Sequence, residues 1–88
     1  MKRMKYELYT ENINYDTTMV IVSSYFPAFS VVNQAGYWMR KKEDSLLITI
    51  IGDLSDRPTI LEMAIEIKKE NKQQAVLVAA CQIDEIMV

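Results

Sequence analysis

The residues best suited to bind a ligand lie around the only tryptophan. Gly36, Tyr37 and Trp38 place a glycine beside two large aromatic rings, and Arg40 follows two positions later. Aromatic faces next to the gap left by a glycine can form a slot for a planar ligand or a partner side chain, and an arginine can hold a carboxylate or phosphate. These four residues are the candidate ligand slot. In the structural alternative, one ring anchors the core, Gly36 marks a bulge or a close backbone approach, and Arg40 belongs to a solvated hairpin tip.

Other reactive combinations are sparse. The chain has no histidine and one cysteine, which removes His–Cys zinc sites, histidine-assisted nucleophiles and internal disulfides. Cys81 has no basic neighbour in the sequence to activate its thiol, so we expect a structural thiol. Asp53 and Asp56 precede a predicted helix, where loop and cap roles explain them better than a metal site. We therefore expect no catalytic residue, no cofactor and no metal.

Composition sets the class of protein. The 88 residues make one domain, 1–88, of which 50% are apolar and 25% charged, with a formal net charge of −2. This balance offers no basic surface for nucleic acid or anionic lipid, and the apolar runs are too short to span a bilayer. The basic start of the chain is not followed by the apolar stretch of an export signal, and a lone cysteine suits a reducing compartment, so we expect a cytoplasmic protein.

Hydrophobic periodicity predicts six elements. Alternation and β-branched or aromatic content favour strands, whereas spacing of three and four favours helices. Charged residues 40–44 are expected to form a turn, 52–57 a loop, and 84–88 a tail that could extend the last strand. The predicted strands cover 4–11, 30–39, 45–51 and 75–83, and the predicted helices cover 17–26 and 58–72.

The first helix is the ambiguous element. Residues 19–22 are mostly β-branched, which suits a strand. Asp16 as an N-cap, apolar residues at helical spacing and Pro27 as a stop favour a helix over 17–26. For the second helix, either Asp56 or a capping box of Thr59 and Glu62 is expected at the N-terminus.

The order strand, helix, strand, strand, helix, strand predicts an α+β fold. With short connections and right-handed crossovers, it corresponds to a ferredoxin-like two-layer sandwich, a four-stranded antiparallel sheet with two helices on one face. If 17–26 were a strand, an all-β domain with one helix would be the alternative.

The strands at 45–51 and 75–83 are apolar on both sides. Strands of that kind are usually covered on both faces, and the helices can cover only one. We therefore expect the other face to bind a second copy or another protein, with Lys5 and Glu7 screening exposed aliphatics as the alternative. The candidate interface residues are Leu47, Thr49, Ile51, Leu77, Ala79 and Cys81.

Short landmarks resemble a family of small uncharacterised bacterial proteins. They are Glu7-Leu8-Tyr9, Phe26-Pro27 before Val31, Gly36-x-Trp38 and Glu43-x-Ser45. The chain departs from the family pattern by lacking an export signal and by having Ala28-Phe29 where a glycine is expected. The resemblance implies a ferredoxin-like fold and no assigned activity.

Two functions follow from these patterns. The first is a small, cytoplasmic, non-catalytic interaction module that self-associates through its sheet as a homodimer, or binds a protein partner there. The alternative is a small-ligand-binding domain that uses the slot near Tyr37 and Trp38.

Overall fold

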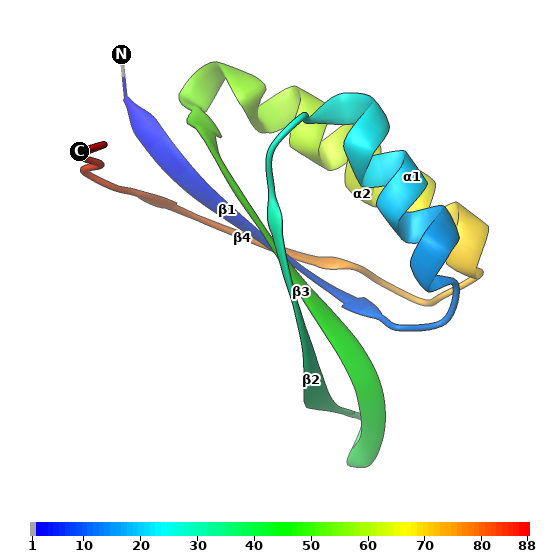
Figure 1. Ribbon diagram of the computed structural model, residues 1–88. Helices are drawn as coiled ribbons and strands as arrows, with labels where there is room; N and C mark the ends of the chain where they lie inside the picture. Colours follow the sequence, from blue (N-terminus) through cyan, green and yellow to red (C-terminus); the bar gives the residue numbers. More distant parts are fainter. Residues whose placement is uncertain (1) are drawn as a thin grey trace.

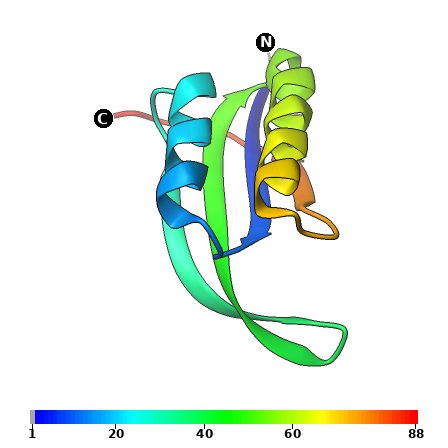
Figure 2. The ribbon, with the colours of Figure 1, turned by 90° about the vertical axis from the view of Figure 1, so that its right-hand side faces the viewer.

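Two helices pack side by side on one face of a four-stranded sheet in the computed structural model, which describes residues 2–88 (Figures 1 and 2). All strand pairings are antiparallel, and the strand order is β2-β3-β1-β4. The predicted ferredoxin-like sandwich is confirmed. In chain order the elements are β1 (Arg3–Glu11), α1 (Tyr15–Tyr25), β2 (Ser30–Trp38), β3 (Lys41–Asp53), the 3-10 turn η1 (Leu54–Asp56), α2 (Arg57–Asn71) and β4 (Leu77–Gln82).

The ambiguous segment forms helix α1. Thr18, Ile21 and Val22 are buried, and their spacing of three and four places them on one helical face toward the sheet. The predicted N-cap at Asp16 is wrong, because the helix begins at Tyr15, two residues earlier than predicted, and Asn14 occupies the N-cap position. Asp16 lies in the first turn, where a negative charge interacts favourably with the helix dipole.

The start of α2 also differs from the prediction. Asp56 stands at the N-cap position, but no side chain caps the helix there, so neither predicted cap forms. The Asp56 carboxylate instead accepts a hydrogen bond at 2.8 Å from the N–H of Asp53, the residue that precedes η1. Pro58 occupies the first turn, where its missing N–H costs nothing. No helix among residues 2–88 is long and apolar enough to cross a membrane.

The core lies between the helices and the inner face of the sheet. Side chains alternate along β1 and β3, so every second one points toward α1 and α2. β1 is a central strand, which places it between β3 and β4. The buried apolar cluster comprises Met4, Tyr6, Leu8, Ile21, Val22, Ile48, Ile50, Ile60, Met63, Ala64 and Ile67.

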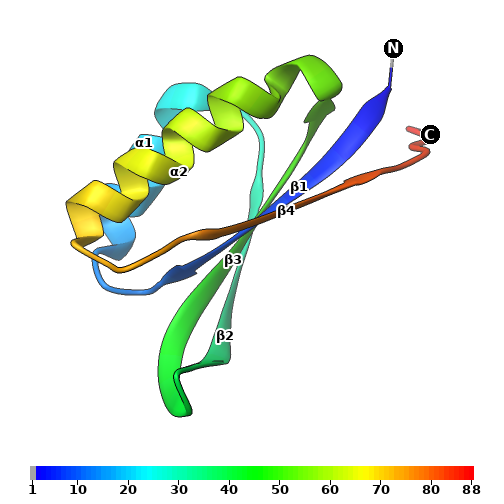
Figure 3. The same cartoon turned by 180° about the vertical axis from the view of Figure 1, so that it is seen from behind.

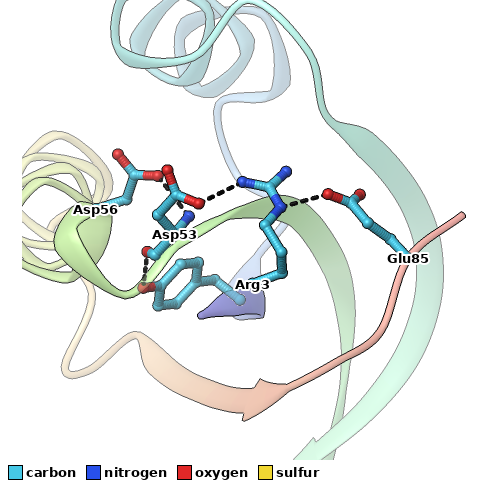
Figure 4. A network of polar contacts seen from close by, with 5 residues as sticks. Arg3, Asp53, Asp56 and Glu85 are labelled. Carbon is cyan, nitrogen blue, oxygen red and sulfur yellow. Dashed lines mark hydrogen bonds and ion pairs between the residues drawn. The ribbon is translucent and has the colours of Figure 1, made fainter. Parts of the chain in front are cut away.

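A polar network ties the two chain ends to the start of α2 (Figure 4). Arg3 donates from Nη1 to Asp53 Oδ1 at 2.6 Å and from Nε to Glu85 Oε1. The buried Tyr6 hydroxyl donates to the Asp53 carbonyl at 2.6 Å, and burial raises the pKa of this phenol, so it stays a neutral donor. These contacts hold the C-terminal tail beside β1, although β4 itself ends at Gln82 and the tail does not extend it as a strand.

The β2–β3 hairpin is longer than predicted. Residues 41–44, expected in a turn, belong to strand β3, and the turn consists of Met39 and Arg40 alone. These two residues have φ of 52° and 66°, which corresponds to the tight two-residue turns that match strand twist. The hairpin extends beyond β1 and β4 (Figures 1 and 3), so its charged residues remain solvated while the backbone stays paired.

Gly36 shows why the hairpin can be so regular. It pairs with Glu43 in unbroken register, so the predicted bulge is wrong. A Cβ at this position would lie 3.3 Å from the Ser45 Cβ, so the crowding comes from a neighbouring side chain and not from another backbone. Glycine therefore permits the two strands to pack tightly where the hairpin leaves the sheet.

We expect the double substitution Met39→Asn with Arg40→Gly to stabilise the protein by about 1 kcal/mol. Asparagine and glycine adopt the left-handed conformations that methionine and arginine hold here at a cost. Urea denaturation would measure the gain as a higher midpoint with an unchanged slope. As a control, Lys41→Gly at the next position, within β3, should lower stability; an Asn-Gly variant no more stable than the wild type would contradict the turn geometry.

Candidate functional site

The face of the sheet opposite the helices carries an apolar row across all four strands. Val32 pairs with Leu47, and Tyr9 lies between Leu47 and Leu77. The next rows mix polar and apolar groups. They are Ser30, Thr49, Glu7 and Ala79, followed by Ile51, Lys5 and Cys81.

All six candidate interface residues lie on this open face. Leu77 is 63% exposed and Ile51 41%, and Cys81 is also exposed. Leu47, Thr49 and Ala79 are half-buried by their strand neighbours. Lys5 and Glu7 sit on β1 in adjacent rows, so the middle of the face carries one charge of each sign.

A pocket of about 360 Å³ adjoins the apolar row where the hairpin leaves the sheet. The hairpin curves toward the side of the molecule that carries the α2–β4 connection (Figure 2). The Trp38 Nε1–H donates to the Gln74 Oε1 at 3.2 Å and links the hairpin to that connection. Three aromatic residues, two carboxylates and several amides surround it. The lining residues are Tyr9, Thr10, Glu11, Gln34, Gly36, Tyr37, Trp38, Glu43, Ser45, Gln73, Gln74, Ala75 and Leu77.

The two carboxylates in the pocket, Glu11 and Glu43, contact each other. Burial raises the pKa of the Glu43 carboxyl above its ordinary value, and the hydrogen bond and negative charge of Glu11 raise it further. Within residues 2–88, neither glutamate has a lysine or arginine in ion-pair contact. The pocket therefore concentrates negative charge that the chain does not neutralise.

Buried amides fix the wall opposite the hairpin. Thr10 Oγ1 and Asn71 Nδ2 both donate to Gln73 Oε1, at 2.8 and 2.9 Å. Gln73 Nε2 donates in turn to the Ala75 carbonyl at 2.6 Å. All three side chains are buried and hydrogen-bonded, so they hold the α2–β4 connection, and with it Gln74, in a defined position.

The Glu11–Glu43 contact makes stability depend on pH. Because the folded-state pKa of Glu43 is raised, the carboxylate costs stability at neutral pH, and protonation relieves that cost as the pH falls. Glu43→Gln should therefore stabilise the protein at pH 7 by about 0.5 kcal/mol, because it removes one of two like charges on neighbouring strands.

The gain from Glu43→Gln should disappear as the pH approaches about 4.3, the ordinary glutamate value. Urea denaturation at several pH values measures it. Asp44→Asn, whose carboxylate already accepts a hydrogen bond from Asn12 at 3.0 Å, is the control and should give no such gain. A constant difference between Glu43→Gln and wild type at all pH values would contradict the carboxylate contact.

The structure brings three of the four ligand-slot candidates together. Gly36, Tyr37 and Trp38 line the pocket, whereas Arg40 lies in the hairpin turn and is not part of the lining. The alternative that an aromatic ring anchors the core is wrong, since Tyr37 is 73% and Trp38 50% exposed.

Most of the pocket lining was not among the ligand-slot candidates, and Tyr9, Glu11 and Glu43 are the missed residues that matter most for its chemistry. Strand alternation puts Tyr9 and Glu11 on the same side of the first strand as Lys5 and Glu7, but nothing in that pattern shows that the hairpin reaches them. Glu43 was hidden because its segment was expected to be a turn. A hairpin turn at Met39-Arg40, with strand alternation continued through Glu43, was the signal that could have found it.

Solved structures of several proteins share this fold. A DUF3240 family protein from Shewanella baltica has a TM-score of 0.80 and 12% identity, covering 100% of this chain and 97% of its own. A phage SAM lyase in the apo state has a TM-score of 0.73 and 18% identity, covering 92% and 81%. CPII, a nitrogen regulatory PII-like protein from Thiomonas intermedia bound to ADP, AMP and bicarbonate, has a TM-score of 0.69 and 12% identity, covering 99% and 98%.

No protein-family model and no curated protein matches the chain. At identities this low, the likeness establishes the fold alone. The ferredoxin-like fold is thus shared with a small bacterial protein of the DUF3240 family, in agreement with the resemblance in the first half of the sequence.

Proposed function

We propose that the chain is a non-catalytic interaction module that forms a homodimer through its open sheet face. One observation carries the proposal: the apolar row of Val32, Leu47, Tyr9 and Leu77 crosses all four strands on the face that no helix covers. Burying such a row against another protein would contribute about 25 cal/mol per Å² of apolar surface. The same row left in water is an exposed patch of the kind that usually marks an interface.

A second copy suits this face better than an unrelated partner. In a two-fold dimer the same patch meets itself, so each charge must find its opposite within the patch. Lys5 and Glu7 provide one charge of each sign, two positions apart on β1, and two antiparallel copies of β1 can pair each lysine with the partner's glutamate. The face is therefore complementary to itself in charge as well as apolar.

The size of the face is also adequate. A standard interface buries about 800 Å² per partner. That is about an eighth of the 6151 Å² that the chain exposes, an area of the order of one face of a small four-stranded sheet.

The non-catalytic part of the proposal is supported by residue chemistry. The fold occurs in an enzyme, a phage SAM lyase, and in a protein bound to nucleotides, CPII, so fold does not choose between them. This chain has no histidine, the residue most often used for acid–base catalysis near neutral pH. Its net charge of −2 separately gives little attraction for nucleic acid. We place it in the cytoplasm, where the exposed thiol of Cys81 would remain reduced.

Native mass spectrometry and light scattering test the proposal directly. The expected result is a mass of two 10.2 kDa chains at micromolar concentration, with dissociation on dilution. Cys81, the only cysteine, offers an independent readout, because its alkylation should slow as the concentration rises and the face becomes covered. A monomer over the whole range, with a constant alkylation rate, would refute the homodimer.

A further inference from the structure

We propose that the pocket beside the apolar row binds a small organic cation, a primary amine carried on a flat apolar group. The pocket shares Tyr9 and Leu77 with the apolar row, but it differs from the proposed dimer contact in combining aromatic rings with two carboxylates. Its volume of about 360 Å³ lies within the range of small-molecule sites and suits a ligand of modest size.

The carboxylates select the charge of the ligand. Glu11 and Glu43 both line the pocket, and no lysine or arginine of the described chain forms an ion pair with either. A primary ammonium has three N–H donors and one positive charge, so it can donate to both carboxylates and remove their repulsion. An anionic ligand would add a third negative charge at the same place.

The aromatic residues select the body of the ligand. Tyr9 forms one wall, and Tyr37 and Trp38 come from the hairpin. Flat apolar groups stack on such rings, and a nearby ammonium gains further from the ring faces. Gly36 and the two carboxylates line the same pocket, so an amine beside the aromatic rings lies near both glutamates.

The walls are held in place before a ligand arrives. Trp38 is tethered by its hydrogen bond to Gln74, and the buried Thr10–Gln73–Asn71 cluster fixes the connection that carries Gln74. A pocket that is already ordered loses little conformational entropy on binding.

Trp38 is the only tryptophan, so its fluorescence reports on this pocket alone. Phenethylammonium chloride is the probe. The protein is excited at a wavelength that only the indole absorbs, and isothermal titration calorimetry is a second readout. The matched probes 2-phenylethanol and 3-phenylpropionate keep the phenyl group and replace the positive charge with none or with a negative one. We expect saturable binding of the amine with a Kd of about 1 mM or below, and at least about tenfold weaker binding of the other two.

Variants locate the binding. Glu11→Gln and Glu43→Gln should each weaken phenethylammonium binding by about tenfold, because each removes a charge-assisted hydrogen bond. Asp44→Asn is the matched control: it removes a carboxylate of the same hairpin that does not line the pocket, and it should leave the Kd unchanged. Circular dichroism would verify that every variant is folded.

Four outcomes would overturn the proposal. Equal binding of the three phenyl probes would make the pocket a purely apolar slot, and a response to calcium chloride but not to the amine would make it a metal site. The other two outcomes are a Kd weakened equally by Asp44→Asn, and no binding by either readout.

Discussion

Ile50→Ala is expected to lower the free energy of unfolding by about 2–5 kcal/mol, whereas Ile51→Ala costs less than about 1 kcal/mol in the monomer. The two isoleucines are consecutive on β3, yet Ile50 is 1% exposed within the core cluster and Ile51 is 41% exposed on the open face. Alanine at Ile50 leaves a cavity between the sheet and the helices. At Ile51 it removes atoms that are already in contact with water.

Urea denaturation at low protein concentration measures this pair, because dilution keeps any dimer from contributing. An 88-residue domain has only a few kcal/mol to lose, so the Ile50→Ala variant should be partly unfolded even without denaturant. Similar losses at the two positions would mean that the face carrying Ile51 is covered within the monomer, and the proposal of an open face would then be wrong.

The two faces of the sheet could be predicted because strand alternation is a local property. Met4, Tyr6 and Leu8 differ in character from Lys5 and Glu7, and the pleat alone sends these two sets to opposite sides. Helix α1 was harder to predict, because its β-branched residues favour a strand locally. Burial of Thr18, Ile21 and Val22 against the sheet overrides that preference.

The pocket could not be predicted in full because it depends on the hairpin's curvature. Two residues with positive φ, Met39 and Arg40, form the turn without the usual glycine or asparagine signal. As a result, the charged run 40–44 was expected to be a turn, although residues 41–44 pair with β2 in regular register. The contact between Trp38 and Gln74 joins positions 36 residues apart, and no local pattern indicates it.

Leu77→Asp is expected to convert the proposed dimer into a monomer, weakening association by at least about 100-fold. Leu77 ends the apolar row on β4 and is 63% exposed in the single chain, so aspartate can stay hydrated in the monomer. In the proposed dimer the same carboxylate would be buried in the interface without a partner. The loss should therefore appear in association and not in folding.

Val20→Asp is the matched control, because Val20 is 69% exposed and lies on α1, away from the open face. Native mass spectrometry should show dimers for Val20→Asp and monomers for Leu77→Asp, and Cys81 alkylation should become independent of concentration only in the latter. Leu47 pairs with Tyr9 from the other side, on β3, and Leu47→Asp should likewise give monomers. If Leu77→Asp and Leu47→Asp both remain dimeric, the chains associate through another surface, because a two-fold contact over this row would bury two new unpaired charges.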